Sequence, residues 1–444
     1  MWFRRVSKLL IFTIVLFAAA SFDGYSQISV NQEFWHLTPY EGLSQSTVSA
    51  IHQDREGFMW FGTQEGLNKY EGQNNNMVVY KHQSDDATTI GSNEIEDIYE
   101  DRQGNLWIAA DWGGLNLYNR DKDTFKRFNA TEELHDGSIS DDTIHDIYED
   151  SQGNLWVGTY LGLNLMNRKE GTFQNFVADS ANPHSLSRNY ITDILEDGSG
   201  QIWVATNNGL NRMHRDSVAF DQIFITQRTS LNPANYVRVI YEDRSGRFWV
   251  GTEDGLYLFN KNTTTFKRWD QKISRSATIL DIAEDEEGVV WIGTENEGLL
   301  AIMPDSKNTY LYTYSENNVQ GLNSNSVYSL YQSKDNILWI GTFDGGLNVL
   351  NRKEPKFKHF KNQPGVQNSL NENSVMSFLK PRGNQLWVGT DGGGINLFNM
   401  KTEEFEFLIH DPDDPQSLSN DVILSLLEDS KNRIWIGTYN GGLT

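Results

Sequence analysis

The sequence GNLWIAADWGGLNLYNR occupies residues 104–120 and returns nearly unchanged as GNLWVGTYLGLNLMNR at residues 153–168. Glycines and aromatic residues interrupt any helical period, and the short apolar runs between them are typical of strands. The two copies differ mainly at the turn, where DWG gives way to YLG. Self-similarity at a fixed spacing indicates a repeated structural unit.

A tryptophan register extends this repeat over the chain, with successive spacings of 42 to 49 residues: Trp60, Trp107, Trp156, Trp203, Trp249, Trp291, Trp339, Trp387 and Trp435. Each copy has an apolar run such as YITDILED, a D-x-x-G turn, a segment such as LWVGT, a short tip ending in glycine, a segment such as LNLYNR and a last short strand such as TFKRF. Four antiparallel strands at this period predict an all-β fold, a β-propeller of four-stranded blades. We expect the repeated tryptophan to pack between neighbouring sheets.

The D-x-x-G turn carries a further signal, three residues before each tryptophan. Glycine occupies this position in the first six copies, and asparagine replaces it in the last three, as Asn336, Asn384 and Asn432. Asparagine is the residue that best replaces glycine in left-handed backbone. The replacement of glycine by asparagine therefore indicates a constraint on the backbone at this position, whereas a ligand site would not predict it.

The segments EDSQGNLWVGTYLGLNLMNR (149–168) and EDSKNRIWIGTYNGGL (428–443) resemble the two-component regulator propeller repeat. The resemblance runs from about residue 33 to the last residue. It implies the extracytoplasmic sensor region of a bacterial hybrid histidine kinase or a related one-protein signalling system. In that family two seven-bladed propellers commonly precede a small β-sandwich, a membrane helix and the kinase.

Nine copies exceed the four to eight blades usual in one ring. We predict a seven-bladed β-propeller over residues 27–363 and the first two blades of a second, truncated propeller over residues 364–444. The last copy breaks off at Thr444, which suggests a fragment. The segment EFWHLTPYEGLS (33–44) aligns with an outer strand and its following loop, so the N-terminus is expected to close a ring, either the first propeller or the missing part of the second.

Residues 1–26 predict a secretory signal peptide. Three basic residues precede the apolar run LLIFTIVLFAAA, which is shorter than the roughly 20 residues of a membrane span. An uncleaved N-terminal anchor is the alternative. The chain has no cysteine, so it has neither disulfides nor a lipid-accepting thiol. We therefore expect a periplasmic protein.

The net charge of the chain is −23 and becomes −25 when the signal peptide removes three basic groups and Asp23. A field of this sign repels polyanions, so nucleic acid, sulfated glycans and anionic lipid surfaces are poor partners. A membrane contact is expected only through a missing downstream segment.

The residues that vary between copies of the repeat gather on one face. In an antiparallel sheet the turn between the second and third strands lies on the same side as the loop that leads to the next blade. Loop tips on a rigid scaffold commonly serve recognition. Aromatic faces beside amides and carboxylates suit a neutral sugar, while packing on a neighbouring tip is the alternative for any single aromatic. The candidate ligand-binding residues on this top face are Asp111, Trp112, Tyr160, Asn207, Asn208, Phe343 and Asp344.

A second set of candidates lies on the innermost strands, at the position two residues after the first aliphatic residue: Asp97, Asp146, Asp193 and Asp281. These carboxylates are expected to line a narrow axial channel. They could hold a cation through oxygen ligands. A hydrated channel wall, or bonds to the next blade, is the favoured interpretation.

The sequence offers no catalytic signature. It lacks H-E-x-x-H, G-x-S-x-G, the phosphate-binding loop and the calcium-loop string. We predict a segment without enzymatic activity, cofactor or metal that recognises a neutral oligosaccharide and, in the intact receptor, signals across the membrane, with a homodimer as a further expectation. The alternatives are a propeller-fold polysaccharide lyase or hydrolase and a protein-docking scaffold.

Overall fold

The computed structural model describes residues 32–444 except 73–76, 132–136, 218, 228–231, 306, 352–359, 364–365, 367 and 382. The predicted signal peptide lies outside the described residues. The chain divides into two compact units, Met1–Lys353 and Glu354–Thr444. The boundary predicted from the sequence, after residue 363, lies within the second unit.

The first blade illustrates how one repeat folds. It is an antiparallel sheet of four consecutive strands, β2 (Val48–Gln53), β3 (Met59–Thr63), β4 (Gly66–Tyr70) and β5 (Met77–Tyr80). Between β2 and β3 the chain reverses in a tight turn, where the side chain of Asp54 accepts the amide of Phe58 at 3.0 Å. Gly57 closes this turn with a φ of 93°, a left-handed value that glycine adopts without strain.

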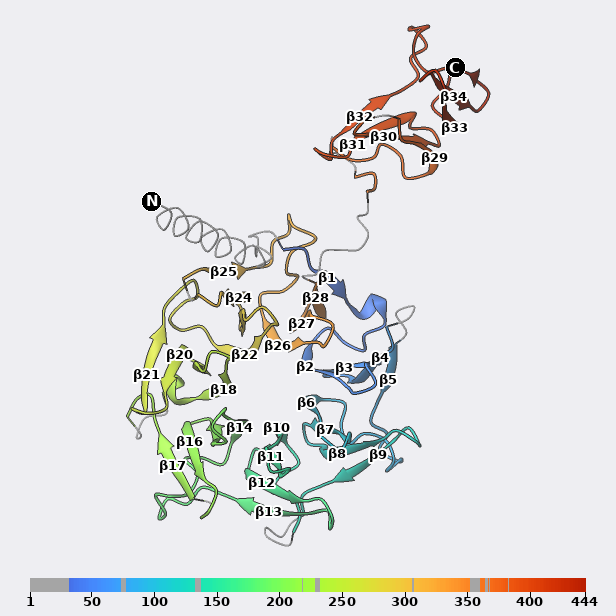
Figure 1. Cartoon of the computed structure of the whole chain (residues 1–444). Helices are drawn as coiled ribbons and strands as arrows, with labels where there is room; N and C mark the ends of the chain where they lie inside the picture. The colour runs from blue at the N-terminus through green and yellow to red at the C-terminus, as the bar shows by residue number, and fades with distance from the viewer. Residues whose placement is uncertain are drawn as a thin grey trace, which may run out of the picture. The chain divides into compact units, whose positions relative to one another are not determined.

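Five further blades repeat this order around a ring (Figure 1). The second to fourth blades are β6 (Ile95–Glu100), β7 (Leu106–Ala110), β8 (Gly114–Asn119) and β9 (Thr124–Phe128); β10 (Ile144–Glu149), β11 (Leu155–Thr159), β12 (Gly162–Asn167) and β13 (Thr172–Phe176); and β14 (Ile191–Glu196), β15 (Ile202–Thr206), β16 (Gly209–His214) and β17 (Ala219–Ile223). The fifth and sixth are β18 (Val237–Glu242), β19 (Phe248–Thr252), β20 (Gly255–Asn260) and β21 (Thr265–Trp269); and β22 (Ile279–Glu284), β23 (Val290–Thr294), β24 (Leu299–Ile302) and β25 (Thr309–Tyr312). Two 3₁₀ turns, Pro39–Glu41 and Pro233–Asn235, lie between strands.

The N-terminal strand closes the ring in the seventh blade. That blade takes three strands from one part of the chain, β26 (Val327–Gln332), β27 (Ile337–Thr342) and β28 (Leu347–Asn351). Its outer strand is β1 (Trp35–Leu37), which pairs antiparallel with β28. The sequence had left open which propeller this strand completes. The structure assigns it to the first ring, beside a strand more than 300 residues away in the chain.

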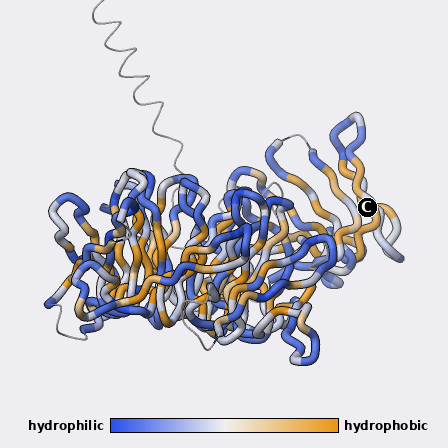
Figure 2. Tube along the Cα trace, turned by 90° about the horizontal axis from the view of Figure 1, so that it is seen from below, coloured by the Kyte–Doolittle hydropathy of each residue, from blue (hydrophilic) through white to orange (hydrophobic). Residues whose placement is uncertain are grey.

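Buried apolar side chains fill the space between neighbouring blades. Ile98 of β6 is 3% exposed and packs in one cluster with Ala50 and Trp60 of the preceding blade. The register tryptophans of the ring, from Trp60 to Trp339, are all buried. Figure 2 shows apolar residues concentrated along the strands and polar residues in the loops. The predicted fold class, an all-β propeller of four-stranded blades, is confirmed.

Ion pairs on the lower face tie each of the first four blades to the next. Asp54 lies in the first blade, and its carboxylate accepts hydrogen bonds from Trp60 of the same blade at 2.9 Å and from Arg120 of the second blade at 2.8 Å. The same link recurs between later blades, with Arg168 on Asp101, Arg215 on Asp150 and Lys261 on Asp197. These links use the aspartate of the D-x-x-G turn and the basic residue that follows the third strand.

Hydrogen bonds also fix the tips and loops of the upper face. The hydroxyl of Thr63, at the end of β3, donates to the carbonyl of Gly66 across the tip at 2.8 Å. The side chain of Asn68 accepts the amide of Ser44, which belongs to the loop before β2, at 2.9 Å. In the fourth blade Thr206 and Asn211 make the corresponding bonds. The upper face is therefore a preorganised surface.

The second unit contains two further sheets among its described residues: β29 (Val375–Leu379), β30 (Gln385–Thr390), β31 (Ile395–Asn399) and β32 (Phe405–Leu408), then β33 (Ile423–Glu428), β34 (Ile434–Thr438) and β35 (Gly442–Leu443). Their shared core contains Ile395, Leu418, Ile423 and Ile436. Phe378 occupies the position of Ile98 but is 63% exposed. This unit thus leaves uncovered a sheet face that is buried throughout the ring.

Candidate functional site

The inner strand of every blade in the ring carries a β-bulge at its second residue. In the third blade Ile144 pairs with Thr159 and Asp146 with Gly158, so that the register skips His145. The same shift occurs in each of the other six blades. A bulge re-aims the side chain of the extra residue. These bulge residues all line one central pocket: Ser49, Glu96, His145, Thr192, Arg238, Leu280 and Tyr328.

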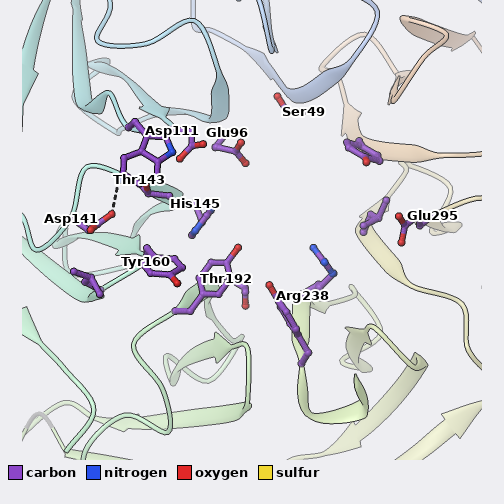
Figure 3. A pocket seen from close by; sticks show the side chains of 16 residues that line it. Ser49, Glu96, Asp111, Asp141, Thr143, His145, Tyr160, Thr192, Arg238 and Glu295 are labelled. Atoms are coloured by element: carbon purple, nitrogen blue, oxygen red, sulfur yellow. Dashed lines mark hydrogen bonds between the residues drawn. The ribbon is translucent and has the colours of Figure 1, made fainter. Parts of the chain in front are cut away.

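The central pocket has a volume of about 800 Å³ and lies at the upper end of the ring axis. Figure 3 shows side chains from several blades converging on it. Strand-joining tips and inter-blade loops supply the rest of the lining: Asp111, Trp112, Asp141, Thr143, Tyr160, Leu161, Tyr190, Tyr236 and Glu295. Bulges and loops of all seven blades therefore build a single concave site, the usual form of a small-molecule pocket.

Three of the predicted ligand-binding residues meet in this pocket. Asp111, Trp112 and Tyr160 come from the tips of adjacent blades. Trp112 is 80% exposed and has a φ of 55°, and Tyr160 is 53% exposed. Large aromatic side chains that remain this exposed on a rigid surface are candidates for contact with a ligand.

An aromatic row continues from Tyr160 across the pocket wall. The ring centroids of Tyr160 and Tyr190 lie 5.2 Å apart, and those of Tyr190 and Tyr236 lie 6.0 Å apart in an edge-to-face arrangement. Arg238 lies over the Tyr236 ring, 4.8 Å from its centroid, and donates to Glu253 at 2.8 Å. The row combines apolar ring faces with phenolic hydroxyls.

Acidic groups dominate one side of the pocket. Burial, together with the negative charge of Asp111, raises the pKa of Glu96 to about 7. Burial also raises the pKa of Asp141, whose carboxylate accepts the amide of Thr143 at 2.8 Å. Arg238 is the cation facing these groups across the pocket (Figure 3). An anionic ligand would have to approach several carboxylates to reach it.

His145 lies at the floor, with its ring 4.5 Å from that of Tyr190. Burial lowers its pKa to about 4, and the charge of Arg238 acts in the same direction. The imidazole is therefore neutral at pH 7. Its Nε2 atom is buried and makes no hydrogen bond within the part of the chain that the structure describes.

The channel carboxylates lie one residue beyond the bulges, and three of them bond to the backbone of the next blade. Asp97 accepts the amide of Ile147, in the next blade, at 3.0 Å, and Asp281 accepts that of Leu330 at 2.6 Å. Asp193 does the same with Ile240 at 2.6 Å. Burial raises the pKa of all four carboxylates, and the charges of Asp193 and Asp97 add to the effect at Asp146. These three bonds join neighbouring blades, whereas the Oδ2 atom of Asp146 is buried and makes no hydrogen bond to any residue that the structure describes.

No group of three or more His, Cys, Asp or Glu residues among those described is arranged to hold a metal ion. Within the same described ranges, none of the helices has the length and apolar character needed to cross a bilayer.

The other predicted site residues lie apart from the central pocket. Asn207 and Asn208 line a second hollow of about 580 Å³, the outer pocket, between the tips of the third and fourth blades. Phe343 packs on Tyr328, with ring centroids 5.4 Å apart, so it supports a pocket residue from behind. Asp344 follows it at the exposed tip, and neither residue lines the two pockets described here.

Sequence reasoning missed most of the pocket floor. It singled out the position of Asp97 on the inner strands, whereas the neighbouring position of Glu96 supplies the bulge residues. A signal was present, because that neighbouring position varies among serine, glutamate, histidine, threonine, arginine, leucine and tyrosine in an otherwise regular repeat. Tyr190 and Tyr236 were missed because they lie at the ends of inter-blade loops.

Comparison with protein families gives eight matches to the two component regulator propeller, at residues 42–65, 89–112, 138–161, 185–208, 232–254, 274–296, 321–344 and 417–440. A segment of 80 residues is 39% identical to histidine kinase P4 from Formosa agariphila and covers 18% of this chain but 6% of the kinase.

Solved structures of similar fold include extracellular domains of two-component systems. The domain of BT3049 from B. thetaiotaomicron is 29% identical, with a TM-score of 0.65, and the match covers 93% of this chain and 53% of that one. The domain of BT4673 from the same organism is 22% identical, with a TM-score of 0.59, over 92% and 51% of the two chains. The chain therefore spans about half the length of these domains. A virginiamycin B lyase from Staphylococcus aureus, 12% identical with a TM-score of 0.53, covers 72% of this chain and 98% of its own, and shares the fold alone.

Proposed function

The chain is a propeller segment of the two-component sensor type, built from two-component regulator propeller repeats, and from this premise we propose that its central pocket binds a neutral oligosaccharide. The observation that carries the proposal is the aromatic row from Tyr160 to Tyr236, with Trp112 at the rim. Sugar rings present C–H faces that stack on aromatic rings, and hydroxyls that bond to neighbouring polar groups. The pocket offers both kinds of partner.

The charge of the pocket supports a neutral ligand. Glu96, Asp111 and Asp141 lie on one side of the pocket, while the guanidinium of Arg238 is already engaged by Glu253. The whole chain carries a net charge of −23, so the long-range field also opposes an anion. A neutral oligosaccharide meets neither penalty.

The rigid upper face supports a role in recognition. Tips and loops are held by hydrogen bonds such as Thr63 to Gly66, so the site needs little reordering when a ligand binds. The similarity to a propeller lyase extends to fold alone. We propose that the segment has no enzymatic activity and acts in the periplasm.

Signalling is the further part of the proposal. In the intact receptor, which we propose to be a homodimer, ligand binding would be passed through a membrane segment downstream of this chain to a histidine kinase. The matches to extracellular domains of hybrid two-component systems support this role. The proposed function does not include binding to nucleic acid.

Titration calorimetry on the full chain tests the binding step. The panel consists of neutral oligosaccharides derived from cellulose, xylan, mannan, galactan and arabinan, together with sulfated oligosaccharides from heparin and chondroitin sulfate. We expect a neutral member to bind and the sulfated members to give no heat. Chromatography of the sugars after incubation should show them unchanged. Tight binding of a sulfated member, cleavage of any sugar, or no binding by the neutral members would overturn the proposal.

A further inference from the structure

We propose that the outer pocket is a second subsite, which binds a neutral sugar unit of the same oligosaccharide beyond the part held in the central pocket. This inference rests on the proposed function, since it requires an oligosaccharide in the central pocket. It also predicts how the bound oligosaccharide runs: outward from the ring axis, between the third and fourth blades.

The two pockets share a wall. Tyr160, Leu161 and Tyr190 line both of them. Tyr160 and Tyr190 also form the first pair of the aromatic row, with centroids 5.2 Å apart. A ligand that stacks on this pair can therefore extend into either hollow. The outer pocket adds about 580 Å³ to the about 800 Å³ of the central one.

Three amide oxygens make the outer pocket a site for hydrogen-bond donors. The side-chain oxygens of Asn207, Asn208 and Gln222 are all buried, and none accepts a hydrogen bond from any residue that the structure describes. All three side chains line this pocket. Asn208 is only 6% exposed as a residue. Buried polar atoms are normally paired, so three unpaired acceptors around one hollow indicate a ligand that supplies donors.

The orientation of Gln222 is fixed by its other atom. Its Nε2 donates to the carbonyl of Ser185 at 2.9 Å and to that of Leu186 at 3.3 Å. Reversing the amide would place its oxygen against two carbonyl oxygens. The Oε1 atom of Gln222 therefore finds no hydrogen-bond donor among the described residues, and only a group from outside the protein can supply one.

The backbone that holds the two asparagines is also fixed. The amide of Asn208 donates to the hydroxyl of Thr206 at 3.2 Å, and that of Asn207 donates to the carbonyl of Tyr190 at 3.2 Å. The second bond ties this tip to the aromatic row. The acceptors are therefore held in place relative to the stacking surface before any ligand binds.

The chemistry of these acceptors selects the class of ligand. A sugar hydroxyl donates to an amide oxygen and can accept a second bond through its own oxygen. A carboxylate or sulfate only accepts, so it would leave the three amide oxygens without a donor, and the one cation in the lining, Arg188, is exposed and shares the pocket with the carboxylate of Asp179. The outer pocket therefore favours a neutral, hydroxyl-rich unit.

The test uses the full chain and ladders of one to six sugars prepared from cellulose, xylan, mannan, galactan and arabinan. Titration calorimetry gives the affinity of each member for the wild type and for three variants. Asn208→Leu removes the amide at similar size, and Asn208→Asp keeps an acceptor at the same place. Gln64→Leu is a control for losing an amide at an exposed tip outside both pockets, in the first blade. Thermal unfolding of each variant monitors the fold.

We expect one ladder to bind the wild type with affinity that rises by about tenfold between its short and long members, the gain that a net 1.4 kcal/mol supplies. Asn208→Leu should remove this gain and leave the affinity of the shortest binding member unchanged. Asn208→Asp should keep most of the gain, and Gln64→Leu should behave as wild type. Should the Leu variant fail to fold, Gln222→Met replaces it in the same comparison.

The outcomes separate the two proposals. If a ladder binds but the gain with length survives both Asn208→Leu and Gln222→Met, the second subsite is wrong and the central pocket stands. The subsite is equally wrong if affinity does not change with length. If no ladder binds the wild type, the proposed function fails, and the subsite with it.

Discussion

Arg120 of the second blade donates from Nη1 to Oδ2 of Asp54 in the first blade, 2.8 Å away, where that carboxylate also receives the indole N–H of Trp60. The Asp54 side chain is fully buried, while that of Arg120 is 23% exposed. One carboxylate thus joins the turn of its own blade, the tryptophan of its own blade and the arginine of the next. The relationship makes the lower face a chain of linked blades.

Arg120→Met should destabilise the ring. Burial raises the pKa of Asp54, but the hydrogen bonds from Arg120 and Trp60 outweigh it and hold that pKa below its ordinary value. Removing one partner of such a pair leaves a buried charge partly uncompensated, which costs about 3–5 kcal/mol in the free energy of unfolding. Chemical denaturation at pH 7 measures the loss.

A pH series gives the same pair a second test. A carboxyl whose pKa is lowered by folding stabilises the folded state above its unfolded pKa and loses that contribution as the pH falls through its folded pKa. The difference between wild type and Arg120→Met should therefore shrink on acidification. Arg55→Met is the control, since Arg55 is 48% exposed. An equal loss in both variants would contradict the assignment.

Glu96→Gln should stabilise the protein at alkaline pH. Burial and the charge of Asp111 raise the Glu96 pKa from 4.5 to about 7. A carboxyl with a raised folded pKa costs nothing below its unfolded pKa, and stability falls as the pH rises toward the folded value. The variant should therefore match wild type at pH 4 and exceed it at pH 8 by at most about 3 kcal/mol. Thermal unfolding at both pH values tests this, with the exposed Glu170→Gln as control.

Trp112→Ala should weaken sugar binding without weakening the fold. A central aromatic contact commonly contributes about 1–3 kcal/mol, or about 5- to 150-fold in affinity. Tyr160→Ala should have a smaller effect. The melting temperature should hardly change, because Trp112 is 80% exposed at a loop tip. Trp35→Ala is the matched control, since Trp35 is 77% exposed on the outer strand β1. Wild-type affinity in the Trp112 variant would mean that this face has been misinterpreted.

Phe34→Ala should open the seventh blade. Phe34 is 3% exposed, packs edge-on against Tyr312 and donates its amide to the carbonyl of Gln320 at 2.7 Å. Truncating a buried phenylalanine costs about 3–5 kcal/mol. Trp35→Ala, one residue away, should cost less than about 0.5 kcal/mol. Similar losses at both positions would argue against closure by β1.

Hydrogen exchange should distinguish the two units. Phe378 and Leu427 are 63% and 61% exposed on inner strands of the second unit. Backbone amides protected by few buried contacts open more easily. We expect strands β29 to β34 to exchange faster than β2 to β28, and a fragment of residues 27–363 to unfold as one cooperative unit. Equal protection across all nine sheets would contradict this.

The tryptophan register predicted the repeat and the blades because both depend on local pattern. A tight turn and alternating strands leave a signature within one unit, and the buried Trp60 and its equivalents follow from it. The partner of β1 could not be predicted in this way, since pairing across more than 300 residues leaves no local trace.

The turn prediction succeeded at two of three asparagines. Asn336 and Asn432 have φ values of 61° and 62°, as the glycine replacement indicated. Asn384 has no positive φ among the described residues, and the neighbouring Gly383 has a φ of 126° instead. Pro381 stands in this copy where the other turns have their aspartate or serine, so the turn takes another course.

Only part of the candidate site was predicted, because a β-bulge breaks the alternation of side chains along a strand. Period-two reasoning assigns successive residues of a strand to opposite faces. A bulge adds one residue and changes which side chain points to the axis. Trp112 and Tyr160 lie at loop tips, where their position does not depend on the strand register, so they could be named as candidates from the sequence.

The bulges separate what a blade needs for folding from what it presents to a ligand. Each bulge residue falls outside the ladder register, so its chemistry can change while the strand pairs as before. The ring thus presents one bulge side chain per blade around a common floor, although the hydroxyls of Ser49 and Thr192 also bond to the next blade. Under the proposed function, substitutions at the other bulge positions would change ligand specificity while the strands pair as before.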